Sequence, residues 1–178
     1  MKRIYLIGYM GVGKTTVGKK LSKLLDLSFI DLDKFIESKY HKTVPDLFKE
    51  KGEQGFRELE RKSLKEVSEI ENVVVSTGGG APCFFDNMNT MNNTGTTVYI
   101  KAEPKELAAR LTASKNVRPI VSDKSAEELL PFIIDHLAKR ENFYNQAHIV
   151  YLTDRLLTKE KVYLTVNGIA DELKKIQK

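Results

Sequence analysis

The chain has 178 residues, of which 41% are hydrophobic and 30% charged, and its formal net charge is +5. This length fits one domain with a core of its own. The positive charge comes without a basic run or an aromatic-interleaved stripe, which argues against nucleic acid and favours a small anionic ligand. No apolar stretch is long enough to cross a membrane. Cys83 is the single cysteine, which excludes an internal disulfide and suits a reducing compartment, so we expect a cytoplasmic protein. We also expect a monomer.

The first motif is a phosphate loop. Residues 8–15 read GYMGVGKT, which fits the pattern G-x-x-x-x-G-K-[ST] at every fixed position. In such a loop backbone N–H groups surround the phosphates of a nucleoside triphosphate, Lys14 approaches the β and γ oxygens, and Thr15 is placed to hold Mg²⁺. A strand candidate at 3–7 precedes the loop and helical spacing follows over 14–26, which is the context that the motif requires.

The second strand candidate, 28–31, ends in a pair of carboxylates. Asp31 and Asp33 are separated by one residue, so on an extended backbone they point to opposite sides. One could then reach the Mg²⁺ shell while the other faces an acceptor. The alternative is that both residues cap the next helix.

Residues 32–70 contain far more helix than one crossover needs, including VPDLF at 44–48 and a charged helix over 56–70. Because the phosphate loop holds only the nucleotide, we expect this insertion to carry specificity. Arg57 and Glu60 share one helical face, so Glu60 can hold the guanidinium in a fixed orientation. An ion pair on the helix surface is the alternative.

The segment 73–76, VVVS, lacks polar alternation, as expected for a central strand covered on both faces. Gly78, Gly79 and Gly80 follow it at the carboxyl edge of the sheet, where ligands collect. Three glycines let the backbone pass close to a bound molecule, although a tight turn is the alternative. Cys83 could act as a reactive thiol there, but an isolated cysteine is more often a small packing residue.

After the fourth strand candidate, 96–100, a polar stretch at 112–124 with Arg118-Pro119 at its middle has the pattern of a mobile lid. The helix after it opens with Ser125 and Glu128 at capping-box spacing, whereas Pro131 should kink that helix or delay its start.

Two further helical patterns say less about chemistry. The Asn-rich stretch 87–94 favours the end of a helix that runs into a turn at Gly95. Arg140 and Tyr144 stand four residues apart near the end of a long helix, and this spacing alone indicates a solvated surface.

The apolar segments alternate with helical and loop stretches, which is the rhythm of βαβ units. We therefore predict an α/β fold, a doubly wound three-layer domain with a five-stranded parallel sheet. The strands are expected at 3–7, 28–31, 73–76, 96–100 and 147–152. We expect a single domain over 1–178, with its core at 1–31, 71–111 and 125–178, a substrate-binding insertion at 32–70 and a lid at 112–124.

Taken together, the motifs resemble the shikimate kinase family in order and spacing across nearly the whole chain. They are the phosphate loop with its extension to Gly18, FIDLD at 29–33, FRELE at 56–60, STGGG at 76–80, Arg118-Pro119 and Arg140-x-x-x-Tyr144. The phosphate loop alone fits many NTPases, but the other motifs are far more specific. The resemblance implies ATP-dependent phosphorylation of the 3-hydroxyl of shikimate, on the route to chorismate and the aromatic amino acids.

The resemblance also implies roles on the acceptor side. Asp33 would bind the shikimate hydroxyls and orient or deprotonate the attacking one. Arg57 and Arg140 would grip the carboxylate, and Glu60 would steady Arg57, because planar guanidinium groups form paired charge-assisted hydrogen bonds. The backbone around Gly78, Gly79 and Gly80 would line the same pocket, with Val44, Phe48 and Phe56 as an apolar wall.

On the nucleotide side, the resemblance implies that Thr15 ligates Mg²⁺ directly and Asp31 through water. Lys14 and Arg118 would offset the charge that develops on the transferred phosphoryl group. Arg110 would pack against adenine. The residues that would bind ATP are Gly11, Val12, Gly13, Lys14, Thr15, Thr16, Arg110 and Arg118.

Gluconate-type and adenylate-type kinases share the phosphate loop and lid and are the alternative within the same class. Asp33, Arg57, Arg140 and the glycine triplet describe an acceptor with neighbouring hydroxyls and a carboxylate, whereas a nucleotide acceptor would need more arginines. A GTP switch protein would need Asn-Lys-x-Asp, which does not occur in the sequence. A catalytically inactive ATP-binding module is disfavoured by intact Lys14, Asp33 and Arg118.

Overall fold

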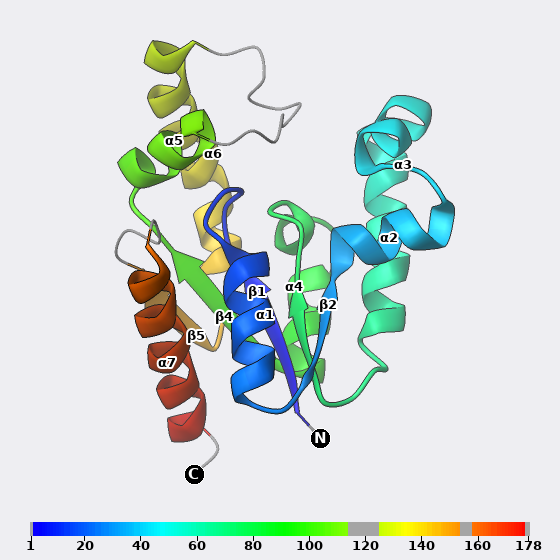
Figure 1. The fold of residues 1–178 in the computed structure, drawn as a ribbon. Helices are drawn as coiled ribbons and strands as arrows, with labels where there is room; N and C mark the ends of the chain where they lie inside the picture. The colour runs from blue at the N-terminus through cyan, green and yellow to red at the C-terminus, as the bar shows by residue number, and fades with distance from the viewer. Residues whose placement is uncertain (1, 114–124, 154–157, 177–178) are drawn as a thin grey trace.

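Five parallel strands form one sheet with the order β2-β3-β1-β4-β5 (Figure 1). The computed structural model describes residues 2–113, 125–153 and 158–176. All five predicted strands are confirmed, the fourth one residue longer and the fifth two residues shorter than expected. They are β1 (Arg3–Ile7), β2 (Ser28–Asp31), β3 (Val73–Ser76), β4 (Thr96–Lys101) and β5 (Ile149–Leu152).

Helices cover both faces of the sheet, which confirms the predicted doubly wound α/β class. One face carries α1 and α7, which pack against each other, and the opposite face carries α4 and the C-terminal half of α6 (Figure 1). The helices are α1 (Lys14–Leu24), α2 (Leu32–Tyr40), α3 (Val44–Val67), α4 (Asn87–Thr94), α5 (Pro104–Ala113), α6 (Ala126–Tyr144) and α7 (Lys159–Ile176), with a 3₁₀ turn, η1, at Ala81–Cys83. Among the described residues, no helix combines the length and apolarity needed to cross a membrane.

The core is built around the two central strands. Tyr5 and Leu6 of β1 are fully buried and pair with Val75 of β3 and Val98 of β4. The run 73–76 is buried along its whole length, as the absence of polar alternation predicts. Ser76 of β3 lies opposite both Leu6 of β1 and Asp31 of β2. The phosphate loop, the Asp31 segment and the glycine triplet therefore leave three adjacent strands at the same edge of the sheet.

The insertion at 32–70 consists of α2 and α3. Helix α3 is not continuous, because Gly52 (φ 67°, ψ 179°) interrupts it with a backbone conformation that glycine adopts most readily. The charged helix expected from residue 56 is the part of α3 that follows this kink. Its inner face buries Phe56, Leu64 and Val67, and this burial holds it against the rest of the molecule.

Two local predictions are wrong in part. The capping box forms between Ser125 and Glu128, but the helix starts at Ala126 in spite of Pro131. The cap and the burial of Leu129 and Ile133 outweigh the one backbone hydrogen bond that proline removes.

The Asn-rich stretch is a complete helix, α4, rather than the end of one. Its buried Met88 and Met91 lie three residues apart and so share one face, which is a sufficient apolar anchor for a short helix. Gly95 then continues in an extended conformation into β4 (φ −171°, ψ −171°), so the expected turn does not form.

Candidate active site

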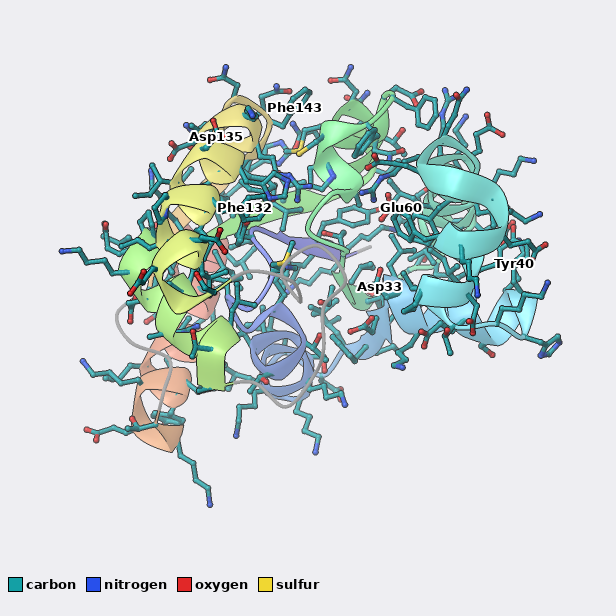
Figure 2. All side chains as sticks on the ribbon, turned by 90° about the horizontal axis from the view of Figure 1, so that it is seen from above. Asp33, Tyr40, Glu60, Phe132, Asp135 and Phe143 are labelled. Atoms are coloured by element: carbon teal, nitrogen blue, oxygen red, sulfur yellow. The ribbon has the colours of Figure 1, made fainter. Side chains whose placement is uncertain are left out.

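A cleft of about 1160 Å³ opens at the carboxyl edge of the sheet. Figure 2 looks down on it, with Asp33 on α2 and Glu60 on α3 to one side of the phosphate loop and Phe132 on α6 to the other. Most residues that the sequence singled out line this cleft: Gly11, Gly13, Lys14, Thr15, Thr16, Asp31, Asp33, Arg57, Gly78, Gly79, Gly80 and Arg140.

The phosphate loop is held by its own backbone and by Lys14. Gly13 adopts a left-handed conformation (φ 98°, ψ 19°) at the start of α1, which the absence of a Cβ makes easy. The buried ammonium of Lys14 donates to the carbonyl oxygens of Gly8 (2.8 Å) and Tyr9 (3.0 Å). The helix N-terminus and this cation together make the loop suited to a polyphosphate.

A hydroxyl and a carboxylate meet beside the loop. Thr15 Oγ1 donates to Asp31 Oδ2 at 2.7 Å, and Asp31 Oδ1 accepts from the backbone N–H of Lys34 at 3.3 Å. Asp31 thus caps α2, as the alternative expected of both carboxylates, and still faces Thr15. Oxygen ligands of this kind are those that Mg²⁺ prefers. Within the described part of the chain no group of three or more His, Cys, Asp or Glu side chains could hold a metal.

The expected geometry of Asp33 is wrong, although its place in the cleft is as expected. Helix α2 already begins at Leu32, so Asp33 lies in its first turn and not on an extended backbone. Asp31 and Asp33 both line the cleft. Across from Asp33 lies Gly78, where an added Cβ would stand 2.9 Å from Asp33 Oδ1 and 2.9 Å from Glu60 Oε1. Two carboxylates therefore flank this glycine closely.

Arg57 forms a buried ion pair with Glu60, so the surface alternative is wrong. Nη1 of Arg57 donates to Oε2 of Glu60 at 2.8 Å, with 6% and 1% of the two side chains exposed. The guanidinium carbon lies 4.2 Å from the ring centre of Phe84, a contact typical of a cation–π interaction. An added Cβ at Gly80 would stand 2.5 Å from Nη2 of Arg57, so this backbone fits closely against the cation.

Burial dominates the electrostatics of Glu60. It raises the pKa of this carboxyl to about 7, against the opposing effect of the Arg57 guanidinium. Apolar surface lies next to this pair, where the rings of Phe48 and Phe56 stack with their centres 4.2 Å apart and line the cleft together with Val44.

Arg140 lies inside the molecule, so the solvated surface that its spacing indicated is wrong. Only 8% of Arg140 is exposed, and Tyr144 is fully buried. The hydroxyl of Tyr144 donates to the carbonyl oxygen of Gly79 at 2.6 Å, and its ring packs on Tyr99 of β4. The reason is tertiary packing, because the end of α6 lies against η1 and the sheet. Arg140 and Arg57 consequently line the same cleft.

Two residues assigned to the nucleotide lie behind the loop. Val12 is fully buried, and its carbonyl oxygen accepts from Nη1 of Arg110 at 2.9 Å. Arg110 also approaches the carbonyl oxygen of Gly11 at 3.4 Å, and 9% of its side chain is exposed. Arg110 therefore braces the phosphate loop, and its expected contact with adenine stays a prediction. Arg118 lies outside the described residues.

The sequence comparisons decide the family. The shikimate kinase family model matches residues 10–170. A shikimate kinase of Parabacteroides distasonis is 54% identical over 169 residues, which cover 95% of this chain and 98% of the relative. The chain belongs to the shikimate kinase family. The predicted family is confirmed, and with it the predicted ATP-dependent shikimate kinase activity.

Solved structures agree with this membership in the shikimate kinase family. The crystal structure of shikimate kinase from Bacteroides thetaiotaomicron matches with a TM-score of 0.94 and 51% identity, covering 97% of this chain and 98% of that one. The Acinetobacter baumannii shikimate kinase in complex with shikimate matches with a TM-score of 0.85 and 32% identity, covering 100% and 96%. A gluconokinase from Sinorhizobium meliloti, at 13% identity and a TM-score of 0.56, shares the fold alone.

Sequence reasoning missed two aromatic residues of this shikimate kinase site. Phe84 covers the Arg57 guanidinium, and its closeness to the glycine triplet was the one available signal. His136 meets Tyr9 of the phosphate loop, and its spacing of four residues from Arg140 could have placed it on the same face of α6. Cys83 is half-buried and burial raises the pKa of its thiol to about 11, which favours the packing role.

Proposed function

We propose that this shikimate kinase binds shikimate between Asp33 and the two guanidinium groups of Arg57 and Arg140, and transfers the γ-phosphoryl group of ATP to its 3-hydroxyl. The observation that carries the proposal is the convergence of these three side chains in the cleft that the phosphate loop opens into. The A. baumannii relative is described in complex with shikimate, which supports the same acceptor here.

The acceptor carboxylate would lie on the two arginines. A guanidinium offers paired donors to a carboxylate, and a fixed one loses less conformational freedom on binding than a mobile side chain does. Arg57 is fixed by Glu60 and Phe84, and Arg140 by its place on the buried end of α6. The stacked rings of Phe48 and Phe56 would cover the apolar part of the acceptor ring.

Asp33 would accept a hydrogen bond from the attacking hydroxyl and receive its proton. Phosphoryl transfer needs the nucleophile to be placed in line with the γ-phosphate far more than it needs covalent chemistry. Asp33 lies in the first turn of α2, directly after the Asp31 segment, and so at the border between the acceptor and phosphate parts of the cleft.

The nucleotide side would work by charge. Lys14 would move from the carbonyl oxygens of Gly8 and Tyr9 to the β and γ oxygens, and Arg118 would offset charge on the transferred phosphoryl group. Thr15 would hold Mg²⁺ directly and Asp31 through water, in keeping with their 2.7 Å contact. When bound, the ion would neutralise charge on the phosphates. We further infer a cytoplasmic monomer, with α2 and α3 as its acceptor-binding part.

The test is ATP-dependent ADP release by the purified protein with Mg²⁺, comparing shikimate, quinate, gluconate, AMP and no acceptor. Saturable stimulation by shikimate alone is expected. Equal stimulation by gluconate or AMP would contradict the assignment of Asp33, Arg57 and Arg140 to a carboxylated polyol. Light scattering on the same sample should give the mass of one chain, 20.2 kDa.

A further inference from the structure

Helix α6 carries a row of side chains that points into the molecule. Phe132, His136, Arg140 and Tyr144 follow one another at intervals of four residues and so lie on one face of the helix. Figure 2 shows Phe132 toward the centre of the molecule, whereas the exposed Asp135 lies on the outer side of α6. Arg140 is the acceptor-binding residue in this row. The other three side chains of the row have no assigned role in the reaction.

The turn before Arg140 is tied to the phosphate loop. Nδ1 of His136 and the hydroxyl of Tyr9 are 2.9 Å apart, and the two rings meet edge to face with their centres 5.6 Å apart. Tyr9 is 1% exposed, and its carbonyl oxygen accepts from the ammonium of Lys14. A residue of the loop therefore contacts the catalytic cation through its backbone and α6 through its side chain.

The imidazole stands in an environment that keeps it neutral. Burial, together with the nearby charges of Arg140 and Lys139, lowers the pKa of His136 to about 4, against the smaller opposing effects of Asp135 and Glu53. Phe132 packs on the other side of the ring with centres 5.0 Å apart. A neutral ring has one unprotonated nitrogen, and with Nδ1 in that form Tyr9 is the donor.

Arg140 thus lies between two hydrogen-bonded turns of the same helix. One turn toward the N-terminus, His136 is tied to the phosphate loop, and one turn toward the C-terminus, Tyr144 is tied to the carbonyl oxygen of Gly79. The phosphate loop is fixed to β1 and α1, so Tyr9 is the fixed partner in its contact with His136. Loss of this tie would remove one of the two contacts that flank Arg140, and so loosen the place where its guanidinium must meet the acceptor.

We propose that His136 is a positioning residue for the kinase reaction. By accepting a hydrogen bond from the hydroxyl of Tyr9, it holds the Arg140 guanidinium in the position where it binds the acceptor carboxylate. This rests on the function proposed for Arg140. Removal of the Tyr9 hydroxyl should therefore weaken shikimate binding and leave the nucleotide, which the loop backbone holds, largely unaffected.

The decisive experiment is a double-mutant cycle on KM for shikimate with Tyr9→Phe and Arg140→Ala. Tyr9→Phe alone should raise this KM about five- to tenfold and change KM for ATP less than about twofold. In the Arg140→Ala background the same change should have almost no further effect, because the residue through which it acts is gone. Fully additive effects would overturn the positioning role. An unchanged KM in Arg140→Ala alone would instead overturn the proposed function of Arg140.

Substitutions of His136 give an independent test of the same proposal. In His136→Asn the amide oxygen can take the position of Nδ1 and accept the Tyr9 hydroxyl, so KM for shikimate should stay within about twofold of the wild type. His136→Leu keeps the apolar contacts but accepts nothing, and it should behave like Tyr9→Phe. If Asn and Leu impair the enzyme equally, the hydrogen bond is not the cause and the proposal fails.

A matched control separates positioning from stability. Tyr5 is also a buried tyrosine whose hydroxyl pairs at 2.9 Å, with Thr94 Oγ1, but this partner belongs to α4 and not to α6. Tyr5→Phe should lower the melting temperature as much as Tyr9→Phe does and leave KM for shikimate unchanged. An equal rise of KM in both variants would identify a general loss of stability and refute the role of His136.

Discussion

The carboxylate of Glu60 accepts a 2.8 Å hydrogen bond from Arg57 in a place where both side chains are almost wholly withdrawn from solvent. Burial raises the pKa of Glu60 from 4.5 to about 7 in the folded protein. A raised pKa contributes stability that is fully present below the unfolded value and is lost as the pH rises through the folded value. The free energy of unfolding of the wild type relative to Glu60→Gln should therefore fall between about pH 4.5 and 7 and level off above. Urea unfolding across this range measures it, and a flat difference would contradict the raised pKa.

Arg57→Ala should weaken the binding of the acceptor and leave the binding of ATP largely unchanged. It removes a fixed guanidinium from the acceptor part of the cleft, so KM for shikimate should rise about ten- to a hundredfold while KM for ATP changes little. Steady-state kinetics with each substrate varied in turn checks this. Because the variant also leaves Glu60 buried without its cation, the matched control is Arg57→Ala with Glu60→Gln, which should recover stability but not KM. Equal changes in both KM values would remove Arg57 from the acceptor site.

Asp33→Asn should separate binding from chemistry. The amide is nearly the same size but cannot take the proton of the attacking hydroxyl, so kcat should fall by about two to four orders of magnitude. The affinity for ADP, measured by calorimetry, should stay close to the wild type. Turnover at the wild-type level would show that another group receives the proton.

Asp31→Asn should increase the Mg²⁺ concentration that the enzyme needs for activity. Asparagine is as good a helix cap as aspartate, so α2 should keep its start, but the site beside Thr15 loses a negative charge. The Mg²⁺ concentration that gives half-maximal activity should rise several-fold, while the melting temperature changes little. If the Mg²⁺ dependence is unaltered, the Thr15 and Asp31 pair has no part in holding the ion.

Arg118→Ala should lower kcat by about two orders of magnitude or more, as removal of a cation that stabilises charge on a transferred phosphoryl group does elsewhere. KM for shikimate should change little, since Arg57 and Arg140 remain. Single-turnover measurements distinguish a slower chemical step from slower product release. A rate equal to the wild type would exclude Arg118 from the transfer step.

Local patterns made part of this molecule predictable. The strand at 73–76 and the phosphate loop depend on residues that are neighbours in the sequence, and both form where expected. The pair of Arg57 and Glu60 needs only helical spacing. The burial of Arg140 was not predictable in the same way, because it depends on how the end of α6 packs against a distant segment. The contact between Tyr9 and His136 joins residues 127 positions apart, and no local pattern reports it.

Asp33 shows a different kind of failure. Its orientation opposite to Asp31 was inferred from an extended backbone, yet the helix begins one residue before it. Asp31 is both the last residue of β2 and the cap of α2, so no residue separates the strand from the helix. Strand and helix ends are the least certain elements of a sequence-based prediction because they depend on single hydrogen bonds.

Three segments that line the cleft leave adjacent parallel strands: the phosphate loop from β1, Asp31 from β2 and the glycine triplet from β3. Adjacent strands lie about 4.8 Å apart, and a shift of one residue along a strand moves its end by about 3.3 Å. The spacing of these three segments is thereby held by backbone hydrogen bonds, which side-chain substitutions other than proline leave in place. Side chains of the central strands can therefore change without altering this spacing, provided that the pairing of the three strands is kept.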